Sequence, residues 1–253
     1  MAEFHGTVTR TEVTIIIVTV TAMRMPMTDE GEWLPLLLAW LSPSYPVGAY
    51  SYSHGLEWAV EQGEVLSRDD LGDYVGAVLE IGGGWSDLVL AAAAWRAVVA
   101  GRRDELAAAA ELALALRPTS EFALESLQQG MAFAATTSAA WPDGAYAAVR
   151  GDHPEGLAYA IAVGAACATR TPLRAMLVAL AHSIAANLVS AGVRLIPLGQ
   201  TDGQRALAAL HPKIAVVVAR AISSTIEDAG SSAVAIDLFS MRHETQYTRL
   251  FRS

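Results

Sequence analysis

The sequence predicts an all-α protein, a single-domain bundle of about ten helices. From residue 33 onward, apolar residues recur at helical spacing, and hardly any segment alternates as a strand would. Glycine, proline and capping residues separate these segments at short intervals. A chain of 253 residues with 53% hydrophobic composition can bury one large core. We therefore expect residues 31–253 to form one helical domain.

In the first half of the chain, helix starts and stops follow from local residues. The prolines of the 42–48 loop end a first helix, and Ser51 or Ser53 can cap the next one. Ser67 with Asp70 forms a Ser-x-x-acid start, a relative of the capping box. The predicted helices are 33–41, one ending at 61, 67–82, 85–100, 103–117 and 120–139.

Local residues also mark the helix starts in the second half of the chain. Pro154 and Pro172 stand at first helical positions, and Thr201 with Gln204 reads as a capping box. His153 and His211 each precede a proline, so we interpret both as helix punctuation. The predicted helices are 154–169, 172–195, 201–210 and 212–228.

The segment 172–195 is apolar on every face and carries no charge between Arg174 and Arg194. Its length approaches that of a membrane span. His182 and Asn187 weigh against insertion, because a polar group in hydrocarbon is costly unless it is paired. We expect a central core helix, with His182 a hydrogen-bonded core histidine rather than a ligand, and no membrane association.

Composition narrows the function. A formal charge of −9 argues against general nucleic-acid binding. The single cysteine, Cys167, excludes an intrachain disulfide and a multi-cysteine metal cluster and fits a cytoplasmic protein. The P-loop, His-Glu-x-x-His, Cys-x-x-Cys and Gly-x-Ser-x-Gly motifs are missing. We expect no enzymatic activity, no cofactor and no metal site.

Residues 1–30 are expected to lie outside the fold, as an N-terminal extension that is disordered or a mis-assigned start. The β-branched run at 13–20 is too short to cross a bilayer. Met23, Met25 or Met27 is then the candidate natural start.

Two segments are candidate sites. The first, 42–57, places Tyr50 in a proline-bracketed loop, followed by His54 and Glu57 at i,i+3. The tyrosines suit a protein interface or packing under the loop, and the His–Glu pair suits a metal or, more simply, a polar helix face. The second, 240–253, interleaves arginines with aromatic residues, which suits an interface hot spot that orders on binding or a solvated basic end.

Three blocks carry a family resemblance. They read PSYPVGAYSYSHGLE at 43–57, NLVSAGVRLIPLGQTDGQ at 187–204 and MRHETQYTRLFRS at 241–253. In this order they resemble the urease accessory protein F (UreF) family. The resemblance implies an all-α homodimer that binds the accessory proteins D (UreD, called UreH in some species) and G (UreG, a GTPase). That complex inserts nickel into apo-urease, so the chain would act as a chaperone or scaffold.

The resemblance also implies residue roles. The terminal block would dock on the D/H protein, and the implied partner-binding residues are Tyr50, His54, Arg242, His243, Glu244, Tyr247 and Arg249. Pro46 and Gly48 would shape the loop. An alternative role is regulation of the partner GTPase, with an arginine supplied in trans. Leu127 stands where the family often has arginine, and Ala49 where it commonly has glycine.

Overall fold

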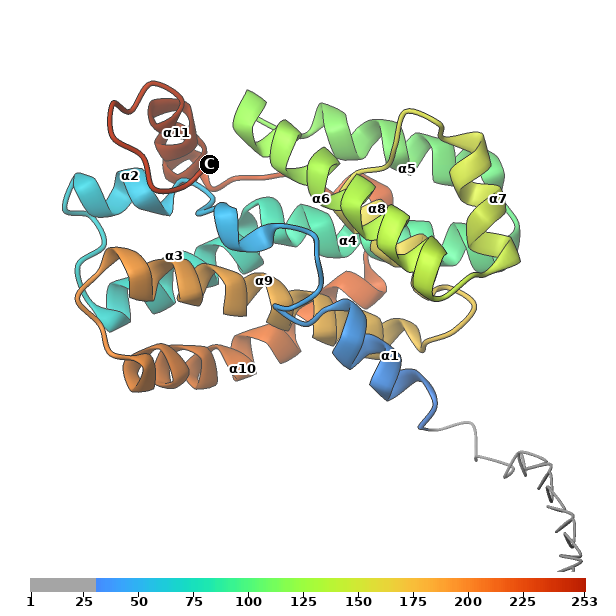
Figure 1. The fold of residues 1–253 in the computed structure, drawn as a ribbon, viewed down its shortest axis with the longest axis horizontal. Helices are drawn as coiled ribbons and strands as arrows, with labels where there is room; N and C mark the ends of the chain where they lie inside the picture. The colour runs from blue at the N-terminus through green and yellow to red at the C-terminus, as the bar shows by residue number, and fades with distance from the viewer. Residues whose placement is uncertain (1–30) are drawn as a thin grey trace, which may run out of the picture.

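A computed structural model of the chain describes residues 31–253 (Figure 1). Over that range the chain is an all-α bundle without strands, as predicted. The proposed extension, residues 1–30, lies outside the described residues.

The first half of the bundle forms close to the predicted positions. Ser67 caps α3 through its hydroxyl, which accepts from the Asp70 amide, while the Asp70 carboxylate accepts from the Ser67 amide. The elements are α1 Trp33–Trp40, the 3-10 helix η1 Ala49–Ser51, α2 Leu56–Glu61, α3 Arg68–Ile81, α4 Gly83–Ala100, α5 Arg103–Ala115 and α6 Ser120–Ala140.

The second half departs from expectation in several places. The elements are α7 Gly144–Asp152, α8 Tyr159–Cys167, α9 Leu173–Leu195, α10 Gln200–Ser223, the 3-10 helix η2 Ile226–Asp228 and α11 Val234–His243. The sequence reading missed α7 and α11. It also began α8 too early: Pro154 lies in a turn after α7, and that helix starts only at Tyr159.

The sequence predicted a new helix starting at Pro212. In the structure Pro212 instead lies inside the continuous α10. Proline removes one backbone donor and normally bends or breaks a helix. Here Leu210, Ile214 and Val217 on either side of it are buried, so packing holds the helix together. His211 is therefore a helical residue and not punctuation, and the Thr201 capping box is replaced by an N-cap at Gly199.

The core lies between α4 and α8, with α6 against α8 on the other side. From Ala160 to Cys167 every residue of α8 is buried. Gly164 permits this approach, because a Cβ there would lie 2.3 Å from the Ala91 carbonyl oxygen of α4. The helices α3, α9 and α10 run side by side below this pair, and α11 lies beside α2 at one end (Figure 1).

The central helix α9 is less enclosed than predicted. Leu177, Leu180 and Leu188 are buried, whereas Val178 and His182 are exposed on one side. Three stretches are long and apolar enough to cross a membrane by length and composition alone: Arg68–Ala100, α9 and α10. The expectation that the protein avoids membranes stays a prediction.

Candidate functional site

The two candidate segments of the sequence meet in space. The Arg252 amide donates to the Ser51 carbonyl at 2.8 Å, and the Ser53 amide donates to the Ser253 carbonyl at 2.8 Å. The terminal segment after α11 therefore lies against the loop that leads into α2 (Figure 1). We call residues 244–253 the tail.

Glu57 is the main acceptor for the tail. It lies on α2 and is buried. Its Oε1 accepts from the Leu250 amide at 2.6 Å, and its Oε2 accepts from the Phe251 amide at 2.9 Å. One carboxylate thus satisfies two consecutive backbone donors, which would be costly to bury without partners.

His243 connects Glu57 to a second buried carboxylate. Its ring is 0% exposed; Nε2 lies 3.1 Å from Glu57 Oε2, and Nδ1 lies 2.7 Å from Glu121 Oε2. The other oxygen of Glu121 accepts from Arg249 at 2.7 Å. Sequence reasoning missed Glu121, whose only signal is an acid in the first turn of α6.

Two further contacts hold the tail. Phe251 is buried, and the Arg194 guanidinium of α9 lies 4.3 Å from its ring centroid, in cation–π range. Ser253 is also buried and donates through Oγ to Glu125 at 2.8 Å. The interpretation of the tail as a solvated basic end is therefore wrong for these residues.

Glu244 joins the tail to the start of α6. Its Oε1 accepts from the Ser120 amide at 2.9 Å and the Ser120 hydroxyl at 2.6 Å. These hydrogen bonds lower the pKa of the Glu244 carboxyl, the Ser120 side chain contributing most. The carboxylate also lies at a helix N-terminus, where negative charge is favoured.

Other side chains of the same region face solvent. Tyr247 is fully exposed at 103%, and Leu250 is 67% exposed. Arg242 and Met241 at the end of α11 are exposed as well. Among the residues implied by the resemblance, His243 and Arg249 are engaged within the chain, whereas Tyr247 and Arg242 are available on the surface.

The loop 43–57 divides its tyrosines in the same way. Tyr45 and Tyr52 are buried and hydrogen-bond Thr137 and Gln128. Tyr50 is 70% exposed. It follows Gly48, whose φ of +76° places the backbone in the left-handed region that glycine favours; Pro46 precedes this turn.

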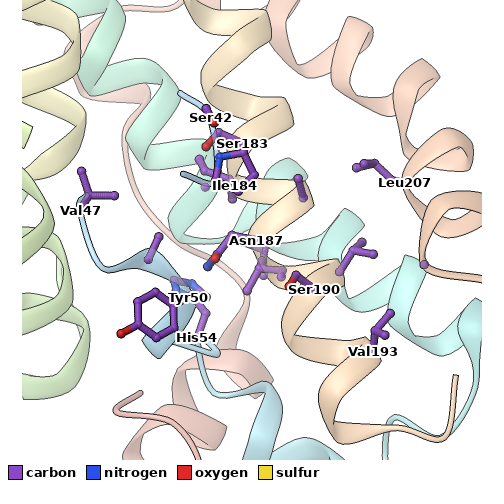
Figure 2. Close-up of a pocket in the computed structure, with 18 of the residues that line it drawn as sticks. Ser42, Val47, Tyr50, His54, Ser183, Ile184, Asn187, Ser190, Val193 and Leu207 are labelled. Atoms are coloured by element: carbon purple, nitrogen blue, oxygen red, sulfur yellow. The ribbon is translucent and has the colours of Figure 1, made fainter. Parts of the chain in front are cut away.

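His54 takes a left-handed backbone conformation, with φ of 57°. Its ring stacks on Phe122 at 4.0 Å between centroids, and Nδ1 lies 3.9 Å from Glu125 Oε2. It borders a cavity of about 450 Å³ that Asn187 and Ser190 of α9 also line (Figure 2). His54 and Glu57 are thus directed to different partners and do not form a metal-ligand pair.

Neither metal nor thiol chemistry stands out in the part of the chain that the structure describes. Residues 31–253 contain no group of three or more His, Cys, Asp or Glu side chains placed to hold a metal ion. Cys167 is buried in α8, and burial raises the pKa of its thiol to about 12.

A second surface lies next to the cavity of about 450 Å³, along α9. An apolar groove of about 960 Å³ runs between α1, α9 and α10, and Leu34, Leu38 and Val178 are exposed along it. His182 and His211 line it, with ring centroids 5.7 Å apart. His182 is therefore a surface histidine rather than the core residue we expected.

Over residues 31–253 the chain is a helical bundle in which the loop 42–57 and the tail meet at one end and present exposed side chains such as Tyr50 and Tyr247. The family model for UreF matches residues 65–211. The chain belongs to the UreF family of urease accessory proteins, as its three blocks predicted.

Three relatives carry the name urease accessory protein UreF. The protein of Granulibacter bethesdensis is 54% identical over 221 residues, which cover 86% of this chain and 92% of the relative. That of Rhodopseudomonas palustris strain HaA2 is 49% identical over 226 residues, covering 89% and 95%. That of Xanthobacter autotrophicus is 47% identical over 222 residues, covering 86% and 90%. Membership of an accessory family implies a non-catalytic role.

Proposed function

We propose that the chain is a cytoplasmic scaffold for urease maturation, which binds the accessory D/H protein and the GTPase G and so supports nickel insertion into apo-urease. Family membership supports the accessory role. We assign the docking surface to the tail because Tyr247 is fully exposed there, on a segment whose backbone is held by hydrogen bonds.

The tail suits a docking surface because its backbone is already fixed. Glu57 and Glu121 hold the residues on both sides of Tyr247. A partner would therefore bind an ordered segment and avoid much of the entropic cost of ordering it. Tyrosine is also among the residues that dominate interface energies.

A point substitution tests this docking surface more cleanly than deletion of residues 241–253. Deletion removes His243 and Arg249 and leaves Glu57 and Glu121 buried without partners. Unpaired buried carboxylates would themselves destabilise the helical bundle. Tyr247→Ala removes only an exposed ring. We expect it to weaken binding of the D/H protein about 30-fold, corresponding to the ~2 kcal/mol of a hot spot.

Leu66→Ala is the matched control, because Leu66 is 62% exposed in the loop before α3. It should bind the D/H protein as the unmodified chain does. Equal affinity of the Tyr247→Ala and Leu66→Ala variants in a titration would refute the assignment of the tail.

We also propose that the groove between α1, α9 and α10 is the homodimer face. Its exposed leucines form an apolar surface of the kind that a second copy would bury. Leu38→Glu should therefore yield a monomer in sedimentation analysis, and Val99→Glu, on exposed α4 surface, should not. If the Leu38→Glu variant still sediments as a dimer, the groove is not the dimer interface.

A further inference from the structure

We infer that Glu57, Glu121 and His243 form a buried clamp that positions Tyr247 and Leu250 for the partner, so that three side chains hidden from the partner set its affinity. The purpose assigned to the clamp rests on the proposed function. The existence of the clamp rests on the structure alone.

The clamp is electrically balanced when the His243 ring carries two protons. Each ring nitrogen lies within hydrogen-bond distance of a different carboxylate, and only an imidazolium donates from both. The two carboxylates then face two cations, the ring and the Arg249 guanidinium. Buried charges are tolerated when they are paired in this way.

The clamp also sets which side chains face outward. Glu57 accepts from the consecutive amides of Leu250 and Phe251. With both amides fixed, Phe251 is directed into the body beside Arg194, and Leu250 is directed to solvent. At the other end of the tail, His243 is fixed by both carboxylates, and the segment between the two anchors carries Tyr247.

Each carboxylate belongs to a different part of the bundle. Glu57 is on α2, directly after the loop of Tyr50, and Glu121 is on α6. His243 is the last residue of α11. The clamp therefore connects the loop and the tail, two of the three segments that carry the family resemblance, through one set of hydrogen bonds.

Glu57→Gln is the direct test, since glutamine keeps the size of the side chain and replaces one acceptor oxygen by a donor. In the full chain, we expect the Leu250 and Phe251 amides to exchange with deuterium at least tenfold faster, while amides of α4 and α8 keep their rates. We expect the affinity for the D/H protein to fall about tenfold, as when the binding-competent state drops to about one tenth.

Tyr247→Ala provides the matched comparison. It should weaken partner binding without changing exchange at Leu250 and Phe251, because its side chain makes no contact with the clamp. Combined with Glu57→Gln, it should show non-additive losses in affinity, since both changes act on the same contact. Additive losses would overturn the positioning role.

A second variant guards against loss of folding. Arg249→Met retains the stem of a partly exposed side chain and removes the cation that donates to Glu121 of the clamp. It should also raise exchange at the tail amides. Unchanged exchange in both clamp variants, or faster exchange with unchanged affinity, would overturn the inference. If the unmodified chain binds no D/H protein, the proposed function fails, and the exchange rates still decide whether the clamp exists.

Discussion

The closest approach of α6 to the chain before α8 gives a sharp stability prediction. Gly130 lies on α6, and a Cβ there would lie 1.9 Å from the Leu157 carbonyl oxygen and 2.8 Å from the Tyr159 amide nitrogen. Both are backbone atoms, so a rotamer change cannot relieve the clash. Gly130→Ala must move the two segments apart by roughly 1.5 Å to restore ordinary contact.

The expected cost follows from two opposing effects. Overpacking of a rigid interior costs up to about 3 kcal/mol. Replacement of glycine by alanine within a helix returns about 1 kcal/mol. Gly130→Ala should therefore destabilise the fold by about 2 kcal/mol, which lowers Tm by about 4–8 °C for a chain of this size.

Gly72→Ala is the control, because Gly72 lies in α3 and a Cβ there meets no atom within 4 Å. It gains helix propensity without a clash, so Tm should rise by about 2–4 °C. Thermal unfolding followed by circular dichroism measures both variants. A Gly130→Ala protein as stable as the unmodified chain would refute the close approach of α6 to Leu157.

Two pH effects should accompany these changes. The pKa of Glu244 is lowered from 4.5 by its hydrogen bonds to Ser120, so its contribution to stability is present above 4.5 and lost as pH falls through the lowered value. Acid should therefore lower the protection of the Ser120 amide against exchange, measured relative to the intrinsic rate at each pH, and Glu244→Gln should abolish that dependence. The pKa of His182 is lowered from 6.5, first by loss of water around the ring and then by the charge of His211. The unfolded chain then binds more protons, so stability to urea should fall as pH drops below 6.5, and it should fall less in His182→Gln.

The helical bundle could be predicted from the sequence because most helix ends are marked locally. Ser67 with Asp70 is such a signal, and the structure uses both groups as predicted. Pro212 misled the prediction, because proline is a local signal and the packing that keeps α10 continuous is not local. The short α7 was missed although Asp143 caps it, through a hydrogen bond to the Tyr146 amide.

The site could be predicted only in part. The motifs singled out the two segments that meet in the structure, but not which of their side chains face inward. Glu57 looked like a polar helix residue, since its acceptor role depends on amides that lie far along the chain. The resemblance implied only a partner-binding role for His243 and Arg249, because the residue that they contact within the chain, Glu121, is 122 and 128 residues away in sequence.

The separation between Glu57 and Leu250 also bears on when the tail surface can form. The hydrogen bond that joins them closes a span of 193 residues. During synthesis, the α2 carboxylate leaves the ribosome long before the amides that donate to it exist, and contacts of such long range form late. Tyr247 therefore reaches its exposed, fixed position only after the bundle beneath it has been made. A partner that reads this surface would distinguish finished chains from nascent ones.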